Sequence, residues 1–417
     1  MTVTNSQELL KRSLLRAANA LVIPLILISL AYFFSPKIVV TQKVLLELAH
    51  YVPYLFLLPA AGLAWRFNRS RAFFIALMFA VAHFLLNEPV LAGFKIERPI
   101  AALFLSYLVP LNLALLVYLK ERGIFTKHGF FRFSLFIFQV LLAVSLVYWD
   151  QAMTMKILAY PLISESILKS SPVPHGAIIV SFVSLVYLFA NLIRSPSSLA
   201  ASKAGILVLF FLAIINIDQP LGDAVLFSVA GISIVLALIQ DSYFMAYHDQ
   251  LTSLPGRRAL DEQLLKLGVK YVLVMVDIDY FKKFNDRFGH DVGDQVLRFI
   301  AVKLESIAGG GKVFRYGGEE FTILFPGKTV WDVEPHLQIT HEMISNSRFY
   351  VRDRSRPKDA PDESSQPTNR KLRKVKITVS MGVAEKSDGH ANPGDVLKQA
   401  DQALYRAKNK GRNRISR

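Results

Sequence analysis

The chain has no cysteine among its 417 residues. Disulfides, thiolate nucleophiles and Cys-ligated metal sites are therefore excluded. Acidic residues are scarce in one part only: residues 1–240 contain 9 Asp and Glu, against 23 in residues 241–417. With so few charges to interrupt them, the apolar runs of residues 1–240 are long, and the mean hydropathy of the chain, +0.36, is high for a soluble protein. Composition thus separates a membrane part from a part with the make-up of an ordinary globular domain.

Residues 1–240 are expected to form an all-α transmembrane bundle of about eight helices, because a span needs roughly 20 mostly apolar residues. The first run is followed by further spans and lacks a small-residue cleavage site, which argues against a cleaved signal peptide. The predicted spans are 17–34, 45–65, 72–91, 99–119, 133–149, 176–193, 204–217 and 223–240.

Lys and Arg residues flank these spans unequally, twelve on the side of the amino terminus and six on the other side. The positive-inside rule then predicts a multi-pass protein of the bacterial cytoplasmic (inner) membrane, with the amino terminus and residues 241–417 in the cytoplasm. Many of the cations behind the net charge of +16 flank the predicted spans in this way. The lipid bilayer is the expected partner of residues 1–240, and no nucleic-acid partner is expected.

Polar groups within the spans leave two interpretations open. His83, Asn112, Gln139 and Asn191 either mark a sensing site for an unknown ligand or provide hydrogen bonds between helices. The extracytoplasmic segment 150–175 is expected to be a loop that packs on the bundle or touches a ligand or the membrane surface.

Residues 241–252 are predicted to be a linker helix and residues 253–417 a separate α+β domain, with a mixed central sheet flanked by helices. The segment 352–374 carries three prolines and many polar residues and is expected to be a disordered insertion. The predicted strands are 271–277, the two arms of a hairpin over 313–325, and 375–381, and the predicted helices include 281–288, 295–304 and 393–408.

The hairpin turn carries Gly317-Gly318 followed by Glu319-Glu320. The glycines supply the positive φ angles of a tight turn and allow a ligand to approach the backbone. The acidic pair is either a solvated turn or part of a divalent-cation site, since Mg²⁺ prefers oxygen ligands and shares them with phosphates. Asp277 ends a strand that is expected to be buried on both faces, where an unpaired acid is costly. Asp279 either caps the next helix or joins the site.

Suitable partners for a nucleotide lie near these acids in the predicted fold. Lys282, Lys408 and Arg412 are placed to neutralise phosphates, and Asn285 and Asp294 are placed to read a base edge. An Asp that accepts from two N–H groups matches guanine and mismatches adenine. The chemistry favours nucleotidyl transfer.

Residues 248–417 resemble the GGDEF family of diguanylate cyclases, here with a Gly-Gly-Glu-Glu-Phe variant. The resemblance implies a nucleotidyl-cyclase or palm-like domain that acts as a homodimer and converts two GTP into cyclic di-GMP and two diphosphates. The matching motifs are Asp249-x-Leu-Thr-x-Leu-Pro, Asp277-Ile-Asp-x-Phe-Lys-x-Phe-Asn-Asp-x-x-Gly-His-x-x-Gly-Asp294, Arg315-Tyr-Gly-Gly-Glu-Glu-Phe321, Thr378-Val-Ser-x-Gly-Val-Ala384 and Ala400-Asp-x-Ala-Leu-Tyr-x-Ala-Lys408-x-x-Gly-Arg-Asn413.

The same resemblance implies roles for single residues. Asp277, Glu319 and the Ile278 carbonyl bind Mg²⁺ or Mn²⁺; Glu319 also accepts the 3′-hydroxyl proton with help from Glu320, and Lys282 stabilises the transition state. The implied substrate-binding residues are Asn285 and Asp294 for guanine with His290 nearby, Gly317 and Gly318 in the turn, and Lys408 and Arg412 for phosphates.

One departure from the family pattern concerns regulation. The family's product-inhibition motif, Arg-x-x-Asp, is replaced by Ala308 and Gly311, so feedback at that position is not expected. Two rival functions remain: a catalytically silent receptor for nucleotide or cyclic di-GMP, and a transporter with a regulatory domain. The intact acids and guanine-reading residues disfavour the first, and the absence of a charged pair within the predicted spans disfavours the second.

Overall fold

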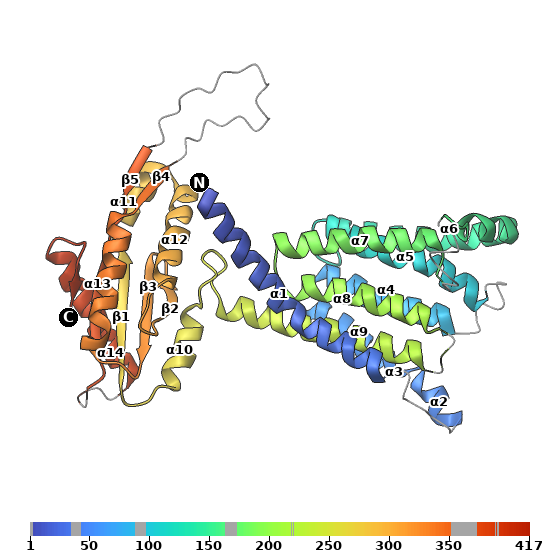
Figure 1. Ribbon diagram of the computed structural model, residues 1–417, viewed down its shortest axis with the longest axis horizontal. Helices are drawn as coiled ribbons and strands as arrows, with labels where there is room; N and C mark the ends of the chain where they lie inside the picture. The colour runs from blue at the N-terminus through green and yellow to red at the C-terminus, as the bar shows by residue number, and fades with distance from the viewer. Residues whose placement is uncertain are drawn as a thin grey trace, which may run out of the picture. The chain divides into compact units, whose positions relative to one another are not determined.

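A computed structural model describes residues 3–34, 43–87, 97–162, 173–217, 219, 221–351, 373–387, 389 and 392–417. The chain divides into two compact units, Met1–Ser242 and Tyr243–Arg417. Figure 1 shows a helical first unit and a second unit in which helices flank a sheet.

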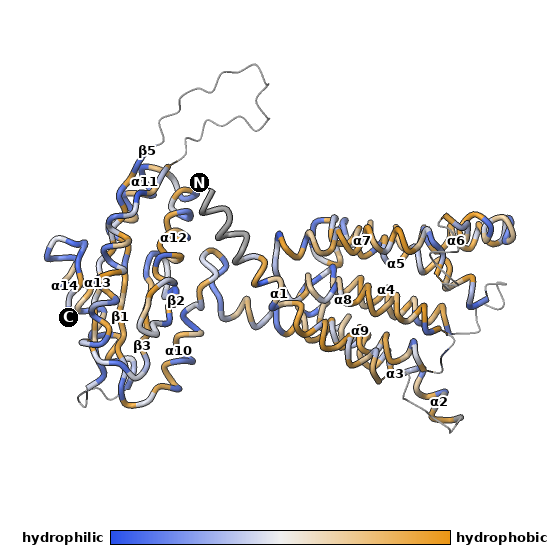
Figure 2. The backbone as a smooth tube through the Cα atoms, in the orientation of Figure 1, coloured by the Kyte–Doolittle hydropathy of each residue, from blue (hydrophilic) through white to orange (hydrophobic). Residues whose placement is uncertain are grey.

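The first unit contains only helices among its described residues. Eight segments of these helices are long and apolar enough to cross a membrane, which is the predicted number. Figure 2 shows that the helices α3 to α9 are hydrophobic along most of their length. The helices are α1 (Val3–Phe34), α2 (Lys43–Ala49), α3 (Val52–Arg66), α4 (Ser70–Asn87), α5 (Arg98–Tyr118), α6 (Lys127–Leu158), α7 (His175–Arg194), α8 (Ser198–Ile215) and α9 (Gly222–Tyr247).

Helices α4, α5, α8 and α9 form the centre of this unit and are mostly buried, whereas α1 and α6 expose most of their side chains. Phe79 of α4, Phe210 of α8 and Phe227 of α9 meet with ring centroids 5.6 to 6.2 Å apart. Aromatic contacts of this kind add to the stabilisation that apolar burial gives.

One prediction for the first unit is wrong. Helix α6 continues through a kink at Asp150 to Leu158, so the first nine residues of the loop expected over 150–175 are helical; residues 163–172 lie outside the described part. An ion pair joins Arg98, which lies just before the predicted span 99–119, to Asp223 at the start of the predicted span 223–240. The two residues are far apart in the chain, so sequence order could not show that they meet.

Asn112 and Gln139 support the interhelical role of polar groups. The two side-chain amides lie on α5 and α6 and exchange hydrogen bonds of 2.7 and 3.1 Å. A reciprocal pair satisfies one donor and one acceptor of each amide within an apolar bundle.

The second unit is built on a five-stranded sheet of order β2-β3-β1-β6-β7. All neighbours are antiparallel except β6 and β7, so the predicted mixed sheet is confirmed. The elements are α10 (Arg257–Leu265), β1 (Tyr271–Ile278), α11 (Phe281–Phe288), α12 (His290–Glu305), β2 (Lys312–Gly317), β3 (Glu320–Pro326), α13 (Val330–Asn346), β4 (Arg348–Val351), β5 (Arg373–Lys376), β6 (Val379–Glu385), α14 (Pro393–Asn409) and β7 (Ile415–Ser416).

The central strand β1 is buried along its whole length, as its unbroken apolar sequence predicts. Alternate side chains of a strand point to opposite faces. Val272, Val274 and Val276 pack in one core with residues of α12 and α13, while Leu273 and Met275 pack in a second core with α10 and α14. Two covered faces fix β1 in register and hold the end of the strand, where Asp277 lies.

Other departures concern short elements. The expected linker helix over 241–252 ends with α9 at Tyr247. Of the expected insertion 352–374, residues 352–372 lie outside the described part, but Arg373 and Lys374 belong to β5, which pairs with β4. The strand expected over 375–381 is divided between β5 and β6. Strands β4, β5 and β7 are four, four and two residues long, too short to give a clear pattern, and β5 is in addition rich in Lys, which strands disfavour.

Candidate functional site

Strand pairing brings the predicted acids together at one end of the sheet. Asp277, the penultimate residue of β1, stands opposite Glu320, the first residue of β3, and Glu319 precedes it in the turn. The expected convergence of the two acidic segments is confirmed by this register. Of the turn glycines only Gly318 has a positive φ, +42°; Gly317 does not, contrary to expectation. A Cβ at either glycine would meet nothing within 4 Å, so the backbone of the turn is open to a ligand.

Asp277 is 4% exposed and forms an ion pair with Lys408, whose Nζ lies 2.8 Å from Oδ2. Burial raises the pKa of the Asp277 carboxyl, and the ammonium of Lys408 opposes that rise. Lys408 lies in the last turn of α14 and reaches the end of β1 because α14 packs directly on β6 and β1. The structure thus brings together Asp277, Glu319, Glu320 and Lys408.

The carboxylates at this corner favour a cation. Burial raises the pKa of Glu319 and of Glu320, and the negative charge of Asp277 raises both further. Among the described residues no group of three or more His, Cys, Asp or Glu side chains is arranged to hold a metal by itself. Asp277 and Glu319 supply carboxylate oxygens, and Mg²⁺ is usually held by one or two carboxylates and completes its shell with water and substrate phosphates. The acids present therefore fit a divalent cation bound together with a nucleotide.

Arg412 lies beside the same corner in an unusual backbone turn. Arg412, Asn413 and Tyr280 have φ angles of +64°, +47° and +58°, a conformation that non-glycine residues seldom adopt. The Arg412 guanidinium stands 4.5 Å from the centroid of the Tyr280 ring, and its charge lowers the pKa of Asp277, although burial and Lys408 affect that pKa more. Strained residues that cluster beside a candidate site are consistent with a functional constraint.

Asp279 has a role that neither sequence interpretation foresaw. Helix α11 has no side-chain cap, so capping by Asp279 is wrong. Its carboxylate, 8% exposed, accepts hydrogen bonds from the hydroxyls of Thr378 and Ser380, both at 2.7 Å, and from the backbone N–H of Asn413 at 3.0 Å. Asp279 therefore attaches the carboxy-terminal segment that carries Arg412 to the sheet. A second buried acid at the end of a strand needs hydrogen-bond partners, and this need could have predicted them from the sequence.

The predicted guanine-reading residues lie on α11 and α12. Asn285 has a buried side-chain oxygen with no hydrogen-bond partner among the described residues, and a Cβ at Gly293 would lie 1.9 Å from that oxygen, so a side chain there would displace the Asn285 amide. Asp294 follows Gly293 and is half-buried. An unpaired buried amide oxygen is rare and is consistent with a site that a ligand completes. His290 begins α12 and Lys282 lies in the first turn of α11, and both are exposed.

The hairpin turn is attached to the segment that follows α9. Arg315 of β2 donates to Asp249 Oδ1 and to the Gly318 carbonyl, both at 2.7 Å. Thr252 also donates to Asp249, through its backbone N–H and its hydroxyl. Burial opposes ionisation of Asp249, but the hydrogen bonds from Thr252 and Arg315 lower its pKa. One arginine thereby connects the entry of the domain with the turn that carries Glu319.

Comparison with known proteins adds an independent finding. Residues 246–414 match the model of the family described as diguanylate cyclase, GGDEF domain. Residues 246–414 are a GGDEF domain. The GGDEF domain is similar to diguanylate cyclase VdcA of Vibrio cholerae, which is 37% identical over 41% of this chain and 46% of that protein. It is also similar to response regulator PleD of Caulobacter vibrioides, 34% identical over 42% of this chain and 37% of that protein. Diguanylate cyclase DgcM of Escherichia coli is 38% identical over 41% of this chain and 38% of that protein.

The chain thus spans less than half the length of these curated relatives. Among solved structures, the coiled coil and GGDEF domain of DgcB from Caulobacter crescentus in complex with c-di-GMP is 30% identical, with a TM-score of 0.40; the match covers 48% of this chain and 98% of that one.

Proposed function

We propose that this protein is a membrane-bound diguanylate cyclase that condenses two GTP into cyclic di-GMP and two diphosphates under the control of its helical unit. The observation that carries the proposal is the register of β1 with β3, which sets Asp277 opposite Glu320 and beside Glu319. The names of the relatives VdcA and DgcM agree with this activity.

In this proposal Asp277, Glu319 and the Ile278 carbonyl hold Mg²⁺ or Mn²⁺, which supplies charge neutralisation for the triphosphate. Asn285 and Asp294 bind guanine, with His290 nearby, and Lys408 and Arg412 bind phosphate oxygens. Because Lys408 is paired with Asp277 in this structure, its ammonium is already held at the corner where phosphate would bind.

Glu319, assisted by Glu320, accepts the proton of the 3′-hydroxyl, and Lys282 stabilises the charge that develops. The 3′-oxygen forms a bond to the α-phosphorus of the second GTP while the bond to diphosphate breaks. Two such steps close the ring, so two domains, each with one GTP, face each other in a homodimer. A base with a raised pKa suits this role because it holds the accepted proton more readily.

Incubation of the purified full-length chain in lipid nanodiscs with GTP and Mg²⁺ tests the proposal. Cyclic di-GMP and diphosphate in a 1:2 ratio are expected. A dimeric sample that binds GTP without forming cyclic di-GMP would instead identify the silent receptor.

The pKa directions predict how the metal requirement depends on pH. Burial raises the pKa of Asp277, Glu319 and Glu320, so protons compete with the cation at a higher pH than they would at an exposed carboxylate, whose pKa is about 4. The Mg²⁺ concentration that gives half-maximal rate is expected to rise as the pH is lowered. A steady-state titration of Mg²⁺ at several pH values measures this, and a requirement that does not change with pH contradicts it.

Asp279→Asn is expected to raise the KM for GTP about tenfold and to change kcat less, since loss of a hydrogen bond to a charged group costs about 1.5–3 kcal/mol. KM is expected to change because Asp279 accepts a hydrogen bond from the Asn413 backbone and so positions Arg412, a proposed phosphate ligand. Asp286→Asn, an exposed change of the same charge on α11, is the control. A fall in kcat with KM unchanged would mean that Asp279 acts on the reaction and does not position Arg412.

Added cyclic di-GMP at micromolar levels is expected to leave the initial rate unchanged. Ala308 and Gly311 carry no charge, and a Cβ at Gly311 would lie 2.7 Å from the Phe325 ring, so an aspartate does not fit there. Rates measured with and without product test this, and strong inhibition would reveal a different inhibitory site.

A further inference from the structure

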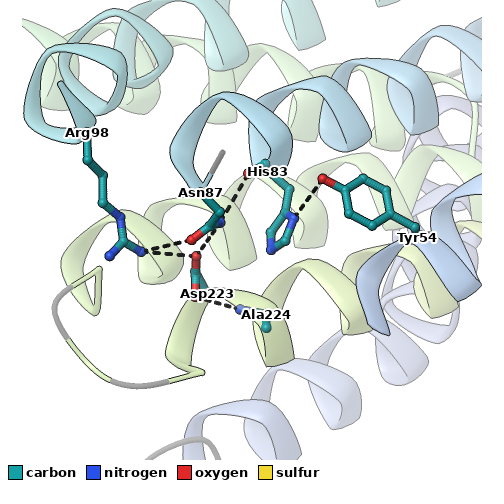
Figure 3. Close-up of polar contacts among 6 residues, drawn as sticks. All are labelled: Tyr54, His83, Asn87, Arg98, Asp223 and Ala224. Carbon is teal, nitrogen blue, oxygen red and sulfur yellow. Dashed lines mark hydrogen bonds and ion pairs between the residues drawn. The ribbon is translucent and has the colours of Figure 1, made fainter. Parts of the chain in front are cut away.

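A polar cluster with a buried acid and a partly exposed arginine lies where α4 ends and α5 and α9 begin. Asp223, 1% exposed, accepts hydrogen bonds from Asn87 at 2.8 Å and from Arg98 at 3.2 Å, and Arg98 also donates to Asn87. One turn before Asn87 on the same helix, His83 has Nδ1 3.2 Å from the Tyr54 hydroxyl. Figure 3 shows these side chains of α3, α4, α5 and α9 directed toward one another. Ionisable groups are expensive in such surroundings and are usually functional.

His83 is a member of the cluster whose hydrogen bonding is incomplete. It is 1% exposed, and its Nε2 has no hydrogen-bond partner among the described residues. Its ring lies against Tyr54 and Phe227, with centroids 5.3 and 5.1 Å away. In the tautomer in which Nδ1–H donates to Tyr54, Nε2 has a free lone pair and no described partner, and a proton would bind there.

The charges that face His83 make its protonation consequential. They are Asp223 on α9 and Arg98 on α5, together with the titratable His50, which precedes α3, and Tyr54 on α3. Asp223 and Arg98 balance each other, so a proton on His83 adds one uncompensated positive charge to a buried site. An uncompensated buried charge costs several kcal/mol unless its surroundings rearrange.

Helix α9 connects this cluster to the GGDEF domain in sequence and in structure. Asp223 is its second residue, and the helix continues without interruption to Tyr247. The Tyr247 carbonyl then accepts from Gly256, which pairs with Arg315, the residue bonded to both Asp249 and the Gly318 carbonyl. A shift of the first turn of α9 thus has a continuous path to the turn that carries Glu319.

We propose that the cluster of His83, Asp223 and Arg98 binds a proton from the extracytoplasmic side and thereby controls the cyclase through α9. The positive charge of protonated His83 repels Arg98 and attracts Asp223, so the contact between α5 and the first turn of α9 changes. Histidine suits this role because its charge changes near neutral pH. The inference rests on the proposed activity for its output but concerns a different site.

Proteoliposomes allow the pH on the two sides of the membrane to be set separately. The bath is kept at constant pH and contains GTP and Mg²⁺, while the lumen is loaded at a pH of about 7.5 or about 4, a range that extends well below the titration of an exposed histidine. GTP does not cross the bilayer, so only molecules with the GGDEF domain in the bath are assayed, and the cluster of these molecules faces the lumen. The cyclase rate is expected to change at least threefold between the two lumen values.

The matched variants are His83→Gln, which keeps a partner for Tyr54 but does not titrate, and His50→Gln, which removes the neighbouring histidine. The response is expected to disappear in the first and to persist in the second. An unchanged wild-type rate, a response that survives His83→Gln, or a response lost only in His50→Gln overturns the proposal.

A second readout does not depend on turnover. Because the chain has no cysteine, Met245→Cys, at an exposed position near the end of α9, accepts a single spin label. Its spectrum is expected to change with lumen pH in the otherwise wild-type chain and not in the His83→Gln background. If the spectrum responds but no cyclic di-GMP forms, the proposed enzyme activity fails while the proton site stands. If the spectrum does not respond, the proton site fails.

Discussion

Glu319→Gln is expected to reduce the rate of cyclic di-GMP formation at least about a hundredfold, the usual effect of removing a general base. The variant removes both the proton acceptor and one carboxylate that the proposal assigns to the cation, yet the amide keeps the shape of the side chain. The measurement is steady-state turnover of the full-length chain with saturating GTP and Mg²⁺. Glu305→Gln, an exposed change of the same kind at the end of α12, is expected to leave the rate unaltered.

The stability of this variant provides a separate check. The folded chain raises the pKa of Glu319, so the folded state binds a proton more readily than the unfolded state does. The stabilisation that results is fully present at low pH and is lost as the pH rises through the folded pKa. Without metal at neutral pH, Glu319→Gln should therefore melt no lower than the wild type. Undiminished turnover would show that Glu319 is not the base, and a much lower melting temperature would show that it has a structural role.

Gly382→Ala is expected to destabilise the GGDEF domain by roughly 3 kcal/mol, at the upper end of what overpacking costs. A Cβ at Gly382 of β6 would lie 2.1 Å from the Leu404 nitrogen and 2.2 Å from the Ala400 oxygen, both backbone atoms of α14. Helix α14 cannot move away from β6 without moving Lys408, so the turnover of the molecules that remain folded should fall as well. Denaturant titration and turnover measure the two effects.

Gly268→Ala is the matched control for this substitution. Gly268 has no positive φ, and a Cβ added there would meet no atom within 4 Å, so the same change should alter stability by less than about 1 kcal/mol. Equal stability of Gly382→Ala and the wild type would mean that α14 does not lie as close to β6 as the structure places it.

The sequence was sufficient where a single pattern determines an element. The apolar residues of Tyr271–Ile278 predict a central strand, and the turn around Gly318 predicts a hairpin, so the meeting of Asp277 with the Glu319–Glu320 pair could be anticipated. Long apolar runs likewise predict eight spans because length and hydropathy alone define them.

Contacts between residues distant in the chain could not be anticipated in the same way. Asp279 binds Asn413, 134 positions later, and Asp223 meets Arg98, 125 positions earlier. Asp279 looks like a helix cap in sequence because capping depends only on neighbouring residues, whereas its real partners are Thr378 just before β6, Ser380 in β6 and Asn413 near the carboxy terminus. The roles assigned to the site residues all stay predictions, and for Lys282 and His290, whose side chains are exposed, the structure adds no contact with the acids.

Binding of Mn²⁺, a spectroscopic substitute for Mg²⁺, tests most directly whether Asp277 and Glu319 share a cation beside the nucleotide. Electron paramagnetic resonance of the full-length chain with 3′-deoxy-GTP, which lacks the attacking hydroxyl, reports metal affinity without turnover. Asp277→Asn and Glu319→Gln should each weaken Mn²⁺ binding at least about tenfold, while the Glu305→Gln control keeps it. Unchanged affinity in both site variants would contradict the account.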